Sequence, residues 1–274
     1  MKRDRIGWRS FVSVLAILGA ILAIAAITKA ATIYVPDDYP TIQQAIDNAS
    51  NGDTIKVYDG VYYENLVIDK KITLQSDSTP IINGNQTGPC ITIKADNVVV
   101  DGFILFNGTY GMYMNDTEKS YNLTIRNCII KNNTQWGAVY LRQNDANKNV
   151  TVLVENNVFE WNGGDNLVID DGAYTQAHPD GFYGYRWIIR NNTFNPCGPS
   201  GSLDYSGLGF EPAIAVLIED NTFNTYWGVW TDNSRYITIK NNVFSYSLGN
   251  GGAGIVVWGD DPSTGTRETS DADA

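Results

Sequence analysis

The sequence predicts an all-β fold, a parallel β-solenoid whose N-terminal end is closed by one short helix. Two observations predict it. A strand–bend–strand motif of six residues recurs along the middle of the chain, and asparagine is unusually common, with 28 residues against 14 leucines. Asparagine favours turns and is a poor residue for helix interiors, so this ratio argues against a helical bundle. Hydrophobic residues make up 43% of the chain, which excludes wholesale disorder.

Residues 1–30 are predicted to be a secretory signal peptide. Four basic residues lie in the first ten positions, an apolar run covers 11–27, and the small residues Ala30 and Ala31 fit a cleavage site. An uncleaved membrane anchor is the alternative, because the run approaches membrane-spanning length. Both interpretations place the rest of the chain outside the cytoplasm, secreted or at the cell surface, with a membrane contacted only through an uncleaved N-terminal segment.

The exported part is strongly acidic. Removing residues 1–30 takes away five basic side chains and one acid, which leaves 14 basic and 29 acidic groups and a net charge of −15. This balance argues against a nucleic-acid partner, because phosphate binding needs Lys and Arg. One histidine and three scattered cysteines (Cys90, Cys128 and Cys197) lack the spacing of a zinc site, and three is an odd number of cysteines for an oxidising compartment.

Eight Asn-x-Ser/Thr sequons also favour export and predict a glycoprotein. They lie at Asn48, Asn85, Asn107, Asn115, Asn122, Asn132, Asn149 and Asn191. The repeat described below places Asn191 where we expect a buried side chain.

Helical spacing of apolar residues marks the segment 41–49. Ile42, Ala45 and Ile46 fall on one face, and a turn at 51–53 and a strand at 54–57 follow. We expect this short amphipathic helix to cap the N-terminal end of the solenoid and to keep its edge from pairing with another strand.

The recurring motif consists of a short strand, an Asn-rich bend and a second short strand that ends in a large apolar residue. Its six copies span 100–105, 125–130, 154–159, 189–194, 218–223 and 239–244. Coils of this kind stack about 4.8 Å apart and bury one continuous core. The alignment predicts an internal stack of Phe159, Phe194, Phe223 and Phe244, continued by Leu105 and Ile130. It also predicts a ladder of bonded amides at Asn157, Asn192, Asn221 and Asn242, in the left-handed backbone geometry that asparagine tolerates.

A third strand follows each bend, and most of its copies open on glycine. These copies span 111–115, 137–141, 166–170, 207–211, 228–232 and 254–258. We therefore expect the solenoid domain to cover 32–258. The remaining residues, 259–274, are rich in acids, Ser, Thr and Gly and are predicted to form a flexible acidic tail.

The beginning of this domain resembles a known family. The stretches Pro40-Thr41-Ile42-Gln43-Gln44-Ala45-Ile46, Asn51-Gly52-Asp53-Thr54-Ile55 and Gly60-Val61-Tyr62-Tyr63-Glu64 resemble the cap and first coil of the pectin-lyase-like superfamily. The later coils, to about residue 258, look like its right-handed parallel β-helix repeats, which include NosD-type proteins and carbohydrate-binding or sugar-hydrolase modules. The resemblance implies a right-handed β-helix and a polysaccharide or other glycan as partner. Gly60-x-Tyr62-x-Glu64 also matches the first motif of pectin methylesterases, but their catalytic motifs and the signatures of polygalacturonases are absent.

Candidate site residues come from the third strand, where side chains alternate between core and solvent. If Leu167, Ile169 and their equivalents point inward, the outward positions bring three acids into one column on successive coils. These acids are Asp170, Glu211 and Asp232, with Asp171 adjacent. Like charges at coil spacing raise one another's pKa or recruit a cation, so the three acids are also candidate Ca²⁺ ligands.

Aromatic residues accompany this column. Gly209 leaves a gap beside Trp230 in which a sugar ring could lie against the indole, and Tyr113 belongs to the same column as Trp230. Trp227 lies nearby, and the longest insertion, 172–184, holds His178 and Tyr183 and is followed by Tyr185. Long insertions on one face of a solenoid usually line its binding surface.

Three functional hypotheses stay open at this stage. A glycosidase would use two of the four acids, and His178 is a further catalytic candidate. A lyase acting on acidic sugars would hold Ca²⁺ through the acids and use Arg142 or Arg186 as proton acceptor or charge stabiliser. A non-catalytic structural or adhesive surface protein, with a solenoid that could associate with copies of itself, is the rival to both.

Overall fold

The computed structural model describes the chain at residues 30–116, 122–143, 151–170, 186–198, 205–211, 213–232, 234–245, 254–260 and 267–272. The chain divides into two units, Met1–Ala30 and Ala31–Ala274, and every element named below belongs to the second unit. Within the described ranges, no helix has the length and apolar character needed to cross a membrane.

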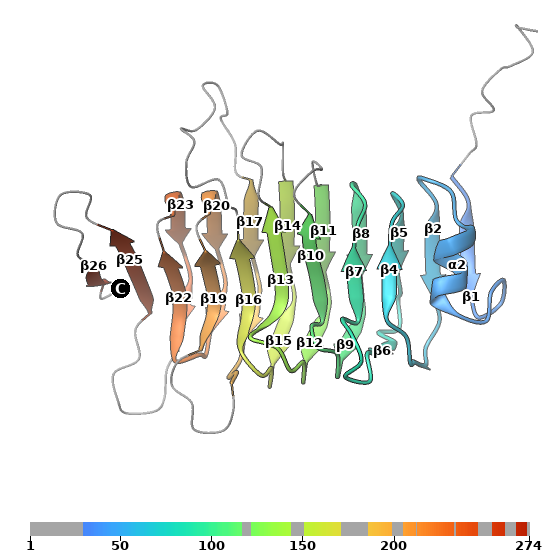
Figure 1. The fold of residues 1–274 in the computed structure, drawn as a ribbon, viewed down its shortest axis with the longest axis horizontal. Helices are drawn as coiled ribbons and strands as arrows, with labels where there is room; N and C mark the ends of the chain where they lie inside the picture. The colour runs from blue at the N-terminus through green and yellow to red at the C-terminus, as the bar shows by residue number, and fades with distance from the viewer. Residues whose placement is uncertain are drawn as a thin grey trace, which may run out of the picture. The chain divides into compact units, whose positions relative to one another are not determined.

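Three β-sheets make up this unit, and neighbouring strands in each sheet come from successive coils (Figure 1). Sheet A contains, in order, β1 (Thr32–Val35), β2 (Thr54–Val57), β5 (Thr73–Gln75), β8 (Val98–Asp101), β11 (Asn122–Arg126), β14 (Thr151–Glu155), β17 (Trp187–Arg190), β20 (Ile214–Glu219) and β23 (Arg235–Lys240). Sheet B contains β3 (Val61–Tyr62), β6 (Ile81–Asn83), β9 (Ile104–Phe106), β12 (Ile129–Lys131), β15 (Val158–Glu160), β18 (Thr193–Phe194), β21 (Thr222–Phe223) and β24 (Val243–Phe244).

Sheet C holds the third strand of each coil. Its order is β4 (Leu66–Ile68), β7 (Ile91–Ile93), β10 (Met112–Asp116), β13 (Gly137–Gln143), β16 (Asp165–Asp170), β19 (Ser206–Glu211), β22 (Trp227–Asp232), β25 (Ile255–Asp260) and β26 (Arg267–Ala272). Apart from the antiparallel pair β25–β26, the pairs between these strands are parallel, as between β13 and β16. The predicted all-β parallel solenoid is therefore confirmed.

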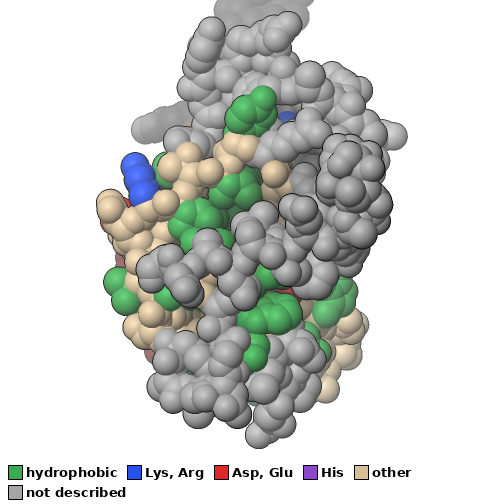
Figure 2. Space-filling model, turned by 90° about the vertical axis from the view of Figure 1, so that its left-hand side faces the viewer, with side chains coloured by type: hydrophobic (Ala, Val, Ile, Leu, Met, Phe, Trp, Pro, Cys, Tyr) green, Lys and Arg blue, Asp and Glu red, His purple; other side chains and the backbone are tan. Residues whose placement is uncertain are grey.

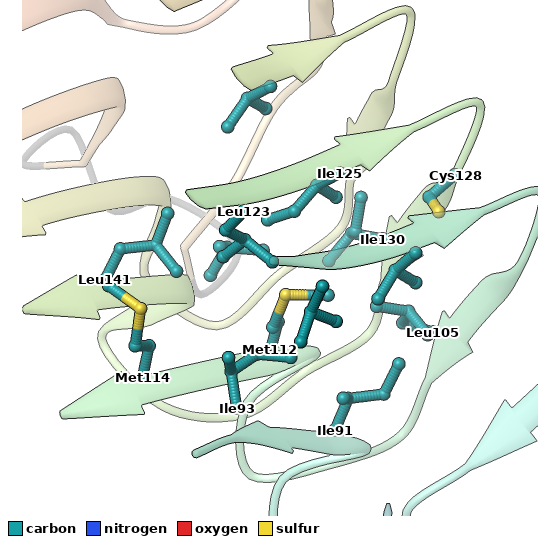
Figure 3. Packing of buried hydrophobic residues seen from close by; sticks show 14 of the residues in the cluster. Ile91, Ile93, Leu105, Met112, Met114, Leu123, Ile125, Cys128, Ile130 and Leu141 are labelled. Carbon is teal, nitrogen blue, oxygen red and sulfur yellow. The ribbon is translucent and has the colours of Figure 1, made fainter. Parts of the chain in front are cut away.

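The core is one continuous hydrophobic cluster inside the coils, and the predicted aromatic stack lies in it. Ring centroids are 4.8 Å apart between Phe159 and Phe194, 4.7 Å between Phe194 and Phe223, and 5.0 Å between Phe223 and Phe244. The column continues through Ile130, which pairs in register with Phe159, and Leu105, which pairs with Ile130. Figure 3 shows how aliphatic side chains fill the earlier coils, with Leu105 and Ile130 stacked across neighbouring strands.

The predicted asparagine ladder is also present. The side-chain Nδ2 of each member donates to the Oδ1 of the next at 3.0 Å, from Asn157 to Asn192, Asn221 and Asn242. Each Oδ1 also accepts from the backbone amide of the previous member at 2.9 Å. The left-handed residue is one position earlier than expected, because the ladder side chain turns inward directly after it. Asn191 is such a residue, with φ 54°, and it is exposed rather than buried.

Helix α2 (Ile42–Asn48) covers the first coils and buries Ile42, Ala45 and Ile46. Thr41 caps its N-terminus, since the Oγ1 accepts from the Gln44 amide at 3.2 Å. The Glu64 carboxylate accepts from the amides of Ile42 and Gln43, both at 2.9 Å. The glutamate of the Gly60-x-Tyr62-x-Glu64 motif therefore anchors the predicted cap helix, where its charge also favours the helix N-terminus.

A column of alternating charge runs along the outer face of sheet A. In register order it reads Asp101, Arg126, Glu155, Arg190, Glu219 and Lys240. Ion pairs join Arg126 to Asp101 at 2.8 Å, Arg190 to Glu155 at 2.8 Å and Lys240 to Glu219 at 2.9 Å. Because a slipped strand would separate these opposite charges, the charge column favours the observed register.

The three cysteines are free. Cys90 and Cys128 are buried in the core, and burial raises the pKa of the Cys90 thiol to about 12 and that of Cys128 to about 11. Burial also raises the pKa of Cys197.

The C-terminal end differs from the predicted flexible tail at one point. Strand β26 pairs antiparallel with β25, from Ile255 opposite Ala272 to Asp260 opposite Arg267. In β24, the strand that precedes β25 in the chain, Phe244 is only partly buried, whereas Phe223 one coil earlier is fully buried. Figure 2, which views the molecule from the side of Figure 1 that carries β25 and β26, shows hydrophobic side chains between polar ones.

Candidate functional site

The predicted acid column lies on the outer face of sheet C. Leu167, Ile169 and Phe210 are fully buried in the core, so the alternate positions face outward. Register pairs Arg142 with Asp170 and Asp170 with Glu211, and one further step along the β19–β22 pairing brings Glu211 opposite Asp232. The sequence alone left the register of the Leu141–Arg142 coil open. The structure places Arg142 in the column as the cation beside the acids.

Asp170 is held by two neighbours. Its Oδ2 lies 3.1 Å from Nε of Arg142 and accepts a hydrogen bond from the Tyr140 hydroxyl at 3.0 Å. Burial and the nearby Asp170 carboxylate raise the pKa of the Tyr140 phenol, which keeps it a hydrogen-bond donor. Asp170 therefore serves this face as a paired anion rather than as an available ligand.

Glu211 is more available for proton transfer or binding than Asp170, which is already paired with Arg142 and Tyr140. Its pKa is raised, first by burial and then by the charges of Asp170 and Asp232, while Arg142 opposes the shift. A carboxyl group with a raised pKa can hold a proton closer to neutrality than an ordinary glutamate.

The described residues of this face do not by themselves form the predicted Ca²⁺ site, which stays a prediction. Among the described residues, no three acidic, histidine or cysteine side chains come together as a metal-binding group. The three acids follow the strands from coil to coil instead of converging, and Asp170 is already paired with Arg142. Hard cations need six or more oxygen ligands around one point, so we derive no chemistry through a metal here.

An aromatic cluster adjoins the acids. The rings of Tyr113 and Tyr140 are stacked, with centroids 5.6 Å apart and planes at 18°. Tyr110 lies 5.0 Å from Tyr113, and Trp136 packs edge-on against Tyr140 at 5.1 Å. Of these, the sequence singled out Tyr113 as a substrate contact. Tyr140 was missed because its register was unresolved, although it pairs directly with Tyr113.

Gly209, where the sequence predicts a gap for a sugar ring, is buried and has polar neighbours. A Cβ built on Gly209 would lie 3.4 Å from Asp165 Oδ2, 3.5 Å from Ser206 Oγ and 3.6 Å from Trp230 Cε3, and nothing would be nearer. These are ordinary van der Waals distances, so a methyl group would fit at Gly209 in contact with a carboxylate, a hydroxyl and an indole. Asp165 and Ser206 were not predicted from the sequence.

Asp165 is the most perturbed acid of this face. Burial raises its pKa to about 6, the Glu211 charge adds to the rise, and hydrogen bonds from Ser206 oppose it. Its Oδ1 accepts from the Ser206 backbone amide and, at 2.9 Å, from the Ser206 hydroxyl. We call the outward surface of sheet C the aromatic–acidic face, formed by Tyr113, Tyr140, Asp165, Gly209, Glu211 and Trp230.

The other predicted site residues fall into two groups. Asp171, His178, Tyr183 and Tyr185 lie within 171–185, outside the described residues. Trp227 is paired in register with Ser206, at the edge of the aromatic–acidic face. Arg186 is buried one residue before β17, at the start of a sheet A strand, so it does not share a sheet with Glu211.

Stacked parallel coils with an aromatic and acidic outer face define a β-helix protein. The chain belongs to the right-handed β-helix family, since the family described as "Right handed beta helix region" matches residues 26–178. The fold class and its handedness are thus as predicted. The chain is also similar to a protein of Methanothermus fervidus described as "Cell surface glycoprotein", with 26% identity over 252 residues. The match covers 75% of this chain and 42% of that relative, so the chain spans less than half of the relative's length. No solved structure matches the chain.

Proposed function

We propose that this chain is an exported, surface-located β-helix protein that binds polysaccharide on its aromatic–acidic face. The description of the relative as a cell surface glycoprotein and the predicted signal segment support the location. The observation that carries the binding proposal is the group of side chains around Gly209, where Trp230, Asp165 and Ser206 come together. The fold by itself identifies only the scaffold and not the function, because β-helices serve many functions.

The chemistry of this group suits a sugar ring. The apolar face of a pyranose packs on an indole, while its hydroxyl groups donate to carboxylates and exchange hydrogen bonds with a serine. Tyr140 and Trp230 stand three coils apart, about 14 Å at the usual strand spacing. Between them lie the small or flat positions Val168 and Gly209, paired in register. A glycan chain along the coil axis would meet an aromatic ring at each end of this floor.

The acidic charge of this face favours some classes of glycan over others. Among the described residues of this face, Asp165, Glu211 and Asp232 outnumber the cation Arg142, which is already paired with Asp170. A polyanionic chain such as polygalacturonate would be repelled, so the favoured class is a neutral polysaccharide. The charge therefore favours this class over the acidic sugars on which a lyase would act.

Hydrolysis is a second candidate activity on the same face. It is favoured by one observation, the raised pKa of both Asp165 and Glu211. Glycosidases of the common type use a protonated carboxyl group as general acid and a second carboxylate as base or nucleophile. Reducing ends that appear with wild-type protein and disappear with Glu211→Gln would support it.

Binding is tested with the part of the chain from residue 31 onward and a panel of neutral and acidic polysaccharides, by affinity electrophoresis. Trp230→Ala should lose the retardation that the wild type shows on a neutral glycan. Trp161→Ala is the matched control, because this tryptophan is 69% exposed and follows β15 of sheet B. Equal retardation of both variants would overturn the assignment of the face, and no retardation of the wild type on any glycan would favour a purely structural or adhesive surface role.

A further inference from the structure

The corner between sheets A and B carries a column of exposed left-handed residues. In five successive coils the residue after the sheet A strand has φ between 54° and 57°, and each of these side chains is exposed. We call them the corner column: Asn127, Asn156, Asn191, Asp220 and Asn241. In four of the five coils the next residue is a ladder asparagine that turns inward. The ladder therefore directs the side chain before it into solvent.

Asn191 is the member of this column that begins a sequon, Asn191-Asn192-Thr193. The equivalent segments Asn156-Asn157-Val158 and Asn241-Asn242-Val243 differ in having valine at the third position. Register pairing confirms the equivalence of these third positions, from Val158 to Thr193, Thr222 and Val243.

The same arrangement occurs once at the corner between sheets B and C. Asn132 is exposed with φ 56°, and Asn133 behind it is buried and donates to Asn162 Oδ1 at 3.1 Å. Thr134 completes the sequon. Two corners thus present an outward asparagine in front of an inward one, followed by threonine.

We propose that Asn132 and Asn191 are N-glycosylation sites. Neither side-chain amide makes a hydrogen bond with another residue in the described part of the chain, and both are exposed. Asn107 provides the contrast, because it has the same φ of 56° and its own sequon, one coil before Asn132. Its Nδ2 donates to Asn83 at 3.2 Å and its Oδ1 accepts from Gln86 at 2.9 Å, so its amide is engaged on both sides.

The modification needs an activated glycan as co-reactant, a lipid-linked glycosyl pyrophosphate. The amide Nδ2 forms a bond to the anomeric carbon, the bond from that carbon to the phosphate oxygen breaks, and the lipid pyrophosphate leaves. The amide gives up one proton to a base of the transferase, and no redox change occurs. An amide that is free of hydrogen bonds and projects from a corner can enter such an enzyme without unfolding the coil.

The inference rests on the export part of the proposed function, and the experiment separates the two. The full chain is produced, with its own N-terminal segment and in parallel with the host's signal peptide, in a host that attaches N-glycans to exported proteins. Glycopeptide mass spectrometry should find modified peptides at Asn132 and Asn191 and an unmodified peptide at Asn107. Thr193→Val should remove one glycan from the intact mass, and it places at 193 the valine that two other coils carry.

A gain-of-modification variant completes the test. Val243→Thr completes a new sequon that begins at Asn241, on an exposed corner, and residue 243 is itself 54% exposed, so the fold should tolerate the change. It should add one glycan at Asn241. Unmodified Asn132 and Asn191 in protein exported by the host's signal would overturn the inference, as would equal occupancy at Asn107 and Asn132. If the protein that carries its own N-terminal segment stays inside the cell, this result contradicts the proposed export instead.

Discussion

Asp165 and Ser206 bridge two neighbouring coils through two hydrogen bonds to one carboxylate oxygen, from the Ser206 amide and from its hydroxyl at 2.9 Å. The other oxygen of Asp165 lies beside Gly209. The same carboxyl group therefore fixes the start of two sheet C strands and forms part of the candidate binding site. Its protonation links the stability of the fold to the chemistry of the face.

The pH dependence of stability follows from this acid. Its folded-state pKa of about 6 lies above the ordinary 3.8, so the protonated form stabilises the fold fully below about pH 4. This contribution, at most about 3 kcal/mol, is lost as the pH rises through about 6. Asp165→Asn should raise the free energy of unfolding in urea at pH 8 and leave it unchanged at pH 4. Asp69→Asn, an exposed control, should show no such difference. An equal effect of Asp165→Asn at both pH values would contradict the argument.

The asparagine ladder predicts a steep cost for losing one amide. Asn192 donates to Asn221, Val154 and Arg190, and accepts from Asn157, all within the buried corner. Asn192→Leu should lower the free energy of unfolding by about 3 kcal/mol or more, because several buried groups lose their partners together. Asn224→Ala, which removes one hydrogen bond to Asn195 from a partly exposed position, should cost about 1 kcal/mol. Chemical denaturation of the two variants compares them, and similar losses would refute a special role for the ladder.

Much of this fold was predictable because the motif aligns without gaps. Once Phe159, Phe194 and Phe223 occupy one position, the inward asparagines and the acid column follow from strand alternation. Asp165 and Ser206 were not predictable, since alternation breaks in the first residues of β19. Leu208 is buried in the core, yet a Cβ on the preceding Gly207 would also meet the interior ring of Phe223, at 2.7 Å. Two successive residues face inward there, which shifts the outward positions that precede them.

The Ca²⁺ site stays a prediction, because the described residues form no metal-binding group and Asp171 lies outside them. Spacing along the chain placed Asp170, Glu211 and Asp232 in a column, but a column of strand positions does not bring oxygens to one point. The pairing of Asp170 with Arg142 depended on a register that the sequence left open.

The charge column predicts a salt-dependent contribution from its central pair. Glu155→Gln removes the acid between Arg126 and Arg190 and with it the ion pair to Arg190. We expect the free energy of unfolding to fall by about 1 kcal/mol at low salt and by less in 1 M NaCl, because salt screens a partly exposed pair. A loss that is independent of salt would show that Glu155 acts through packing instead.

The buried thiols predict slow chemical modification. With pKa values of about 12 for Cys90 and about 11 for Cys128, almost no thiolate forms at pH 8 and the core excludes the reagent. Iodoacetamide should therefore leave both unlabelled in folded protein and label both in guanidinium chloride, as peptide mass spectrometry reports. Rapid labelling without denaturant would contradict their placement in the core.

The central claim, that a glycan binds at Gly209 beside Trp230, is tested most directly by adding one methyl group there. A Cβ at this position meets only ordinary contacts, so Gly209→Ala should fold with an unchanged melting temperature. Isothermal titration with the neutral glycan that the wild type binds should show at least tenfold weaker affinity for Gly209→Ala. An affinity equal to that of the wild type, in a folded variant, would contradict the account.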